Sequence, residues 1–272
     1  MMLLARVAAW SIYAFSAILL LAQVVSHEIG FLLGRRHIRQ TEEPGEREGV
    51  GLLVGGVLAL LAFVLALTLS FANDRYGERR AGTLAEANAI GTAWLRAKAI
   101  GQPRGDHIAE QLEKYTELRI AFVTAEHDPA RLLRLNDETN ALQSAIWADV
   151  SAIVREQPNP VSTSLMASLN DVFDMTTAER FAFEFRLPSQ IFWLLIGLTL
   201  IGMAMLGYQQ ALRGPRLKII AALLCLVWTV VIVDILDLAA ARVGNFRTTA
   251  EAYEWTLQGF HGGPPAPAAL KP

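Results

Sequence analysis

The chain has 272 residues, of which 53% are hydrophobic and only 18% are charged. Soluble domains carry about 25% charged residues, so this composition argues against an ordinary soluble protein. The formal net charge of -2 gives no electrostatic basis for a nucleic-acid partner. The single cysteine excludes an intramolecular disulfide.

Four apolar blocks follow one another along the chain. They cover residues 7–33, 50–71, 191–208 and 217–233. A bilayer core about 30 Å thick needs about 20 apolar residues in helical form, and each block is close to that length or longer. The first block is longer than the apolar region of a secretion signal, so we expect a retained span. The composition therefore predicts an all-α membrane protein with four transmembrane helices.

Basic residues flank the blocks on both sides of the membrane in nearly equal numbers. Arg35 and Arg213 lie on one side, whereas Arg75 and Arg180 lie on the other. The positive-inside rule compares these two sides, and the near balance leaves the orientation open.

The segment between the second and third blocks is rich in charge and is not membrane-like. Two apolar stripes recur there at helical spacing, through Ile108, Leu112, Tyr115, Leu118 and Phe122 and through Leu132, Leu135, Leu142, Ile146, Val150 and Val154. Prolines at 103, 129 and 160 mark helix boundaries. These patterns predict an extramembrane domain of about four helices.

The expected organisation has four parts. Residues 1–72 hold the first two transmembrane helices, residues 73–187 form the inserted helical domain, and residues 188–240 hold the last two transmembrane helices. Residues 241–272 form a C-terminal segment. Its end, from 261 to 272, is rich in Gly, Pro and Ala and is expected to be disordered.

Motifs of enzymes are missing from the sequence. There is no P-loop, no dinucleotide-binding glycine pattern and no nucleophile elbow. The five histidines are scattered and show no metal-ligand spacing with the lone cysteine. We therefore expect a protein that is not an enzyme and that needs no cofactor or metal.

Two acids stand at the end of the fourth block. Asp234 and Asp237 are three residues apart and share one helix face. An ionisable residue at membrane depth suggests a function. Equally, both acids can lie in the interface and pair with Arg242 or with arginines of another span.

The second block continues into a charged segment without a proline. Its notable residues are Asp74, Arg75, Tyr76, Glu78, Arg79, Glu86 and Asn88. One interpretation is a solvated helix end with weak pairs such as Arg75–Glu78, in which Glu86 and Asn88 cap or pair with neighbouring helices. The other is the mouth of a conduction path, with rings of charge where several subunits surround an axis.

At these residues the chain resembles the bacterial bestrophin-like domain family, a group of four-span membrane proteins. The matching segments are EIGFLLGRR at 28–36, SFANDRYGERR at 70–80, EANAIGTAWLRA at 86–97, SLNDVFD at 168–174, RLP at 186–188 and GY at 207–208, together with Asp234 and Asp237. The resemblance covers about residues 26–250, and 86–97 is its most specific stretch. More distantly, 74–80 is similar to the acidic-Arg-aromatic-x-Glu-x-Arg pattern that ends the second span of bestrophins.

The resemblance implies an oligomeric ion channel, pentameric and mostly anion-conducting, with inorganic ions and further copies of the chain as partners. It also implies a multi-pass location in the bilayer, in the inner membrane of a bacterium. The second span would line the pore, with Ala59, Phe63 and Leu67 at the apolar neck. Their i, i+4, i+8 spacing places them on one helix face, although residues so spaced can equally face lipid or another helix. The competing hypothesis is a non-conducting membrane scaffold or sensor whose helical domain binds a partner.

Overall fold

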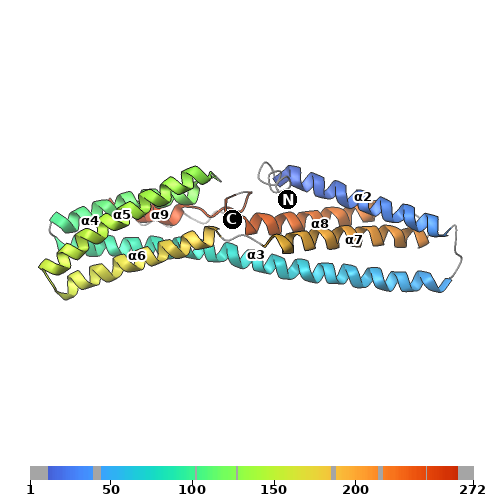
Figure 1. Cartoon of the computed structure of the whole chain (residues 1–272), viewed down its shortest axis with the longest axis horizontal. Helices are drawn as coiled ribbons and strands as arrows, with labels where there is room; N and C mark the ends of the chain where they lie inside the picture. Colours follow the sequence, from blue (N-terminus) through green and yellow to red (C-terminus); the bar gives the residue numbers. More distant parts are fainter. Residues whose placement is uncertain are drawn as a thin grey trace. The chain divides into compact units, whose positions relative to one another are not determined.

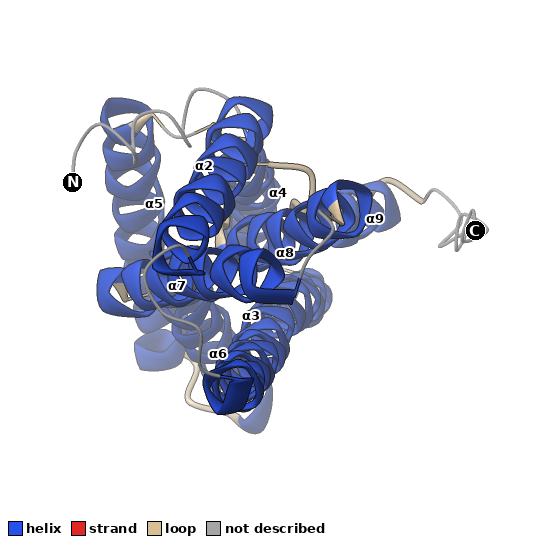
Figure 2. Cartoon of the chain, turned by 90° about the vertical axis from the view of Figure 1, so that its right-hand side faces the viewer, coloured by secondary structure: helices blue, strands red, loops and turns tan. Residues whose placement is uncertain are grey.

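The computed structural model describes residues 12–38, 44–101, 103–126, 128–184, 188–213, 217–242 and 244–262. This part of the chain contains helices and no β-strand (Figure 2). The predicted all-α class is confirmed. The tail that was predicted to be disordered lies outside the described ranges from residue 263 onward. Residues 186 and 187 of the RLP motif also lie outside them.

The helices follow one another in the order shown by colour in Figure 1. They are α2 (Ile12–Ile38), α3 (Pro44–Ile100), α4 (Pro103–Thr124), α5 (Pro129–Glu156), α6 (Pro160–Glu184), α7 (Ser189–Arg213), α8 (Lys218–Ala239) and α9 (Glu251–Phe260). Four helices are long and apolar enough to cross a membrane. The described parts of the apolar blocks fall in α2, the first part of α3, α7 and α8, which confirms the four predicted spans, while residues 7–11 of the first block lie outside the described ranges.

Helix boundaries coincide with the predicted breaks. α4, α5 and α6 each begin at a proline, whose missing N–H would have no helical partner at that position. The carboxylate of Asp128 caps α5 by accepting from the amides of Ala130 and Arg131 at 3.0 and 3.3 Å. Gly101 ends α3 with φ at 63°, a left-handed conformation that favours glycine.

The described residues form two compact units. The first contains α2, α3 up to Asp74, α7, α8 and residues 244–246. The second contains α3 from Arg75, α4, α5, α6, α9 and residues 241–242. α3 is one continuous helix that contributes to both units.

Close backbone contact between α2 and α7 organises the first unit. A Cβ atom at Gly30 of α2 would overlap the backbone of Ala204, and one at Gly207 of α7 would overlap the carbonyl of His27. Only glycine fits at these two positions. Small residues allow membrane helices to pack through their backbones, where dispersion replaces the hydrophobic effect as the driving force.

The second unit has its own apolar core. Its fully buried members include Ile90, Ile108, Leu112, Ile146, Val150, Leu165, Leu169, Val172 and Tyr253. The two stripes predicted on α4 and α5 supply much of this core. α9 docks onto it through Tyr253, and the ring of Phe260 stacks on Trp94 with centroids 4.7 Å apart. This helix was not predicted within residues 241–272.

Candidate functional site

The first candidate feature is the exposed face of α3 within the apolar block. Phe63 and Leu67 are 61% and 57% exposed, and Ala59 is exposed one turn earlier. Leu61 and Leu65, on the opposite face, are 0% and 2% exposed. The three residues predicted to form a neck therefore share a face that points away from the rest of the first unit.

Asp74 follows Phe63 by eleven residues, or about three helical turns, and so lies on the same face. Its side chain is exposed. In the second unit, Arg75 and Glu78 form an ion pair with an N–O distance of 2.6 Å. Arg79 is 1% exposed, and its guanidinium lies 5.9 Å from the ring centroid of Tyr76. The charges that follow the span thus differ strongly in their access to water.

Glu86 lies in the interior of the second unit rather than on its surface. Nε of Arg119 donates to Oε1 of Glu86 at 2.7 Å, and a terminal nitrogen donates to Oε2 at 3.1 Å. Both side chains are at most 1% exposed. Burial acts to lower the pKa of Arg119, but the carboxylate of Glu86 more than offsets it and raises that pKa. The pair is a buried, bidentate bridge between α3 and α4.

Hydroxyl groups complete the shell around Glu86. Thr176 of α6 donates to Oε1 at 2.7 Å, and Tyr253 of α9 donates to Oε2 at 2.6 Å. Tyr115 of α4 is hydrogen-bonded to Thr176 at 2.5 Å and accepts from Gln143 of α5 at 2.8 Å. Burial, followed by the Glu86 charge, raises the pKa of Tyr115 to about 12. Groups of α3, α4, α6 and α9 thus meet at one carboxylate, and α5 joins them through the hydrogen bond from Gln143 to Tyr115. We call this set the Glu86 network.

Asn88, two residues after Glu86, is exposed. The helix turns by about 200° between them, which places Asn88 on the outer face of α3. The structure does not bring Glu86 and Asn88 together.

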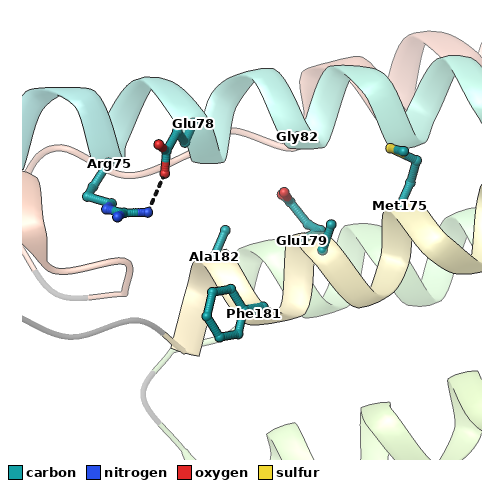
Figure 3. A pocket seen from close by; sticks show the side chains of 8 residues that line it. Arg75, Glu78, Gly82, Met175, Glu179, Phe181 and Ala182 are labelled. Atoms are coloured by element: carbon teal, nitrogen blue, oxygen red, sulfur yellow. Dashed lines mark hydrogen bonds and ion pairs between the residues drawn. The ribbon is translucent and has the colours of Figure 1, made fainter.

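A second buried acid lies beside the Glu86 network. Glu179 of α6 is 1% exposed, and its Oε1 contacts the hydroxyl of Thr83 on α3. Figure 3 shows its carboxyl group directed at α3 beside Gly82, at the edge of a cavity of about 230 Å³. Arg75, Glu78, Met175 and Phe181 line the same cavity.

The two acids at the end of α8 have different surroundings. Asp237 is 3% exposed and accepts from the amides of Asn245 and Phe246 at 2.8 and 3.2 Å. Gly244, with φ at 96°, leaves the space that this carboxylate fills. Asp234 is half-buried and lines a groove between α2 and α8. Asp237 therefore holds the turn after the span.

Arg242, considered from sequence as a partner for these acids, has other contacts in the second unit. Its guanidinium donates to the carbonyls of Phe122 and Ala125 at 2.7 and 3.1 Å. It also lies 4.5 and 4.9 Å from the ring centroids of Phe122 and Phe183. Arg242 thus satisfies carbonyls at the C-terminal end of α4.

Several polar residues of the interior were not singled out from the sequence: Arg119, Thr176, Glu179 and Tyr253. A signal existed for Arg119, which stands seven residues after Leu112 and hence in register with the predicted apolar stripe. A charge in such a register indicates a buried partner of opposite sign.

No model of a known protein family matches the chain, and neither does any curated protein. Solved structures do match. A bestrophin homologue from Klebsiella pneumoniae shares 15% identity with a TM-score of 0.62, covering 91% of this chain and 99% of its own. A point variant of that homologue shares 14% identity with a TM-score of 0.63, covering 90% and 98%. A structure described as a membrane protein shares 14% identity with a TM-score of 0.62, covering 93% and 100%.

The fold and the four apolar helices define a multi-pass, all-α membrane protein. More particularly, the chain has the fold of the bacterial bestrophin homologues over about nine-tenths of its length, with 91% covered by the first of these matches. The resemblance predicted from the motifs is confirmed at the level of the fold.

Proposed function

We propose that this protein is an oligomeric ion channel of the bestrophin-like type, with α3 of each copy lining a central pore. The observation that carries the proposal is the exposed face of α3 within the apolar block, on which Phe63 and Leu67 are 61% and 57% exposed. In a membrane such a face meets lipid or other copies of the chain. The bestrophin-like fold supports the second arrangement, and five copies are expected by resemblance.

In this arrangement Ala59, Phe63 and Leu67 of each copy form stacked apolar rings. Such rings can close a pore by dewetting, because water and ions leave a narrow apolar segment. The neck would then set the resting leak of the channel, and shortening its side chains would raise it.

The charges near the neck bear on ion selectivity. Anion conduction was expected from the resemblance. However, Arg79 is 1% exposed and Arg75 is paired with Glu78, whereas Asp74 is exposed on the face of Phe63. A ring of carboxylates attracts cations. We therefore propose that the Asp74 ring favours cations over anions.

Ion flux from liposomes tests the proposal. Purified protein should release ions faster than empty liposomes, and Phe63→Ala should raise the rate. Ile201→Ala is the matched control, because Ile201 is 54% exposed on a different span, α7. It should leave the rate unchanged. Native mass spectrometry of the same preparation should give several copies per particle.

Flux equal to that of empty liposomes, across voltages and salts, would contradict conduction. Oligomers without flux would favour the alternative function, a membrane scaffold or sensor. The exposed apolar side chains of the second unit would then be candidates for partner binding, with Leu133 and Phe181 at 61% and 69% exposed.

A further inference from the structure

Glu179 occupies an environment that is unusual for a glutamate. It lies on α6, outside the apolar spans, and is 1% exposed. Its Oε2 faces Gly82 of α3 and has no hydrogen-bond donor among the described residues. A Cβ atom at position 82 would overlap this oxygen. A buried carboxylate oxygen without a donor carries a large desolvation cost.

The contact at Oε1 contains a proton-counting problem. The Thr83 hydroxyl contacts Glu179 Oε1 and also lies 2.9 Å from the carbonyl oxygen of Arg79. A hydroxyl has one proton, and neither a carbonyl nor an ionised carboxylate can donate. Both contacts are fully satisfied if Glu179 is protonated, whereas an ionised Glu179 would have to share the Thr83 proton with the Arg79 carbonyl. In the protonated form the O–H of Glu179 donates to Thr83, and Thr83 donates to the Arg79 carbonyl.

Charged groups on the elements around Glu179 act in both directions. Arg79 on α3 and Arg119 on α4 favour its ionised form, and Glu86 on α3 opposes it. Arg119 is already bound in a bidentate bridge to Glu86. The guanidinium of Arg242 and the hydroxyl of Tyr253 on α9 also interact electrostatically with Glu179. Both donate their hydrogen bonds to other acceptors, the carbonyl of Phe122 and the carboxylate of Glu86. Burial has the largest effect and raises the pKa of Glu179 to about 7, against the hydrogen bond from Thr83, which has the next largest effect and lowers that pKa.

We propose that the contact between Glu179 of α6 and Thr83 of α3 is a pH-sensitive switch. The contact is closed when Glu179 is a neutral acid. When Glu179 ionises, its carboxylate moves out of the interior of the unit and toward the adjacent cavity. There its surroundings are water and the rim residues Arg75 and Glu78. Because α3 also carries the candidate neck, opening of this contact would couple a change in pH to the proposed pore. The switch itself does not depend on conduction.

Infrared difference spectroscopy of the full-length protein in detergent tests the protonation. A carboxylic-acid C=O band should titrate near pH 7 and be absent in Glu179→Gln. The Thr83→Val variant should shift its frequency, because the hydrogen-bond partner is lost. If the wild-type spectrum showed no carboxylic-acid band at pH values above the ordinary pKa of glutamate, the proposal would be overturned. This outcome can be read from the wild type alone, even if neither variant folds.

Hydrogen exchange tests the movement. After correction for the intrinsic rate, amides of α3 around Thr83 should lose protection as pH rises toward 7, by up to about tenfold per pH unit, and the loss should level off above pH 7. Glu179→Gln should abolish this dependence, whereas Glu184→Gln, an exposed acid on the same helix, should retain it. The same pH response in wild type and Glu179→Gln would refute the switch. Failure of flux in liposomes would affect the channel proposal alone.

Discussion

Arg119 donates to Glu86 through two nitrogen atoms, at 2.7 and 3.1 Å, in an interior from which water is excluded. Neither side chain has access to solvent that could compensate for loss of the other. The bridge joins α3 and α4, and the remaining donors bring in α6 and α9.

Glu86→Ala should reduce the free energy of unfolding by about 3–5 kcal/mol, because Arg119 is left as an uncompensated buried charge. Denaturant unfolding of the full-length protein in detergent measures this change. The exposed pair Arg180–Glu184, with an N–O distance of 3.0 Å, provides the control. Glu184→Ala should cost less than about 1 kcal/mol. Equal losses in the two variants would refute the central role of the bridge.

Tyr253→Phe removes one hydroxyl donor to Glu86 while keeping the ring in the core. We expect a loss of about 1.5–3 kcal/mol, the range for a hydrogen bond to a charged group. Hydrogen exchange should show α9 opening more readily than the rest of the unit. Trp255→Phe, a change at a 39% exposed position on the same helix, should not have this effect. If α9 kept its protection in Tyr253→Phe, the hydroxyl would not be what holds it.

Gly207→Ala should destabilise the first unit, because the added methyl group overlaps the carbonyl of His27. The expected cost is about 1–3 kcal/mol, as for other overpacked interiors. Gly197→Ala, on the same helix with open space around it, is the matched control. Thermal unfolding in detergent should separate the two variants, and identical melting curves would contradict backbone packing of α2 against α7.

Asp74→Lys should reverse the ion preference of the proposed pore, since each copy would place a cation where an exposed carboxylate now lies. Reversal potentials under a salt gradient measure the ratio of cation to anion permeability. Asp171→Lys makes the same charge change at an exposed position of α6 and should leave the ratio unchanged. An unaltered ratio in Asp74→Lys would remove Asp74 from the conduction path.

Stability should fall as pH rises from about 4.5 to about 7. The native pKa of Glu179, about 7, exceeds the ordinary value of 4.5, so the folded chain holds a proton that the unfolded chain has released. This contribution is fully present below pH 4.5 and is lost as pH passes through 7. The denaturant midpoint of the wild type should fall over this pH range, and Glu179→Gln should lack this part of the pH dependence. A wild-type midpoint that rose with pH relative to that of Glu179→Gln would contradict the prediction.

Local features of the sequence predicted much of this fold. Apolar length marks the spans, and prolines 103, 129 and 160 start helices because their missing amide fits there. Helical spacing also predicts that Ala59, Phe63 and Leu67 share one face of α3, but the exposure of that face is known only from the structure. The Glu86 network could not be predicted in this way. The three side chains that donate to Glu86 lie 33, 90 and 167 residues from it in the sequence, and their pairing depends on which helix faces meet. Buried charges look like surface charges until their partners are known.

The docking of α9 has a consequence for biosynthesis. Tyr253 follows the fourth span, so it leaves the ribosome only after Glu86, Arg119 and all four spans have been translated. Until then Oε2 of Glu86 accepts from Arg119 alone, and the second unit exists without its final hydrogen bond. Maturation of this unit therefore finishes after membrane insertion.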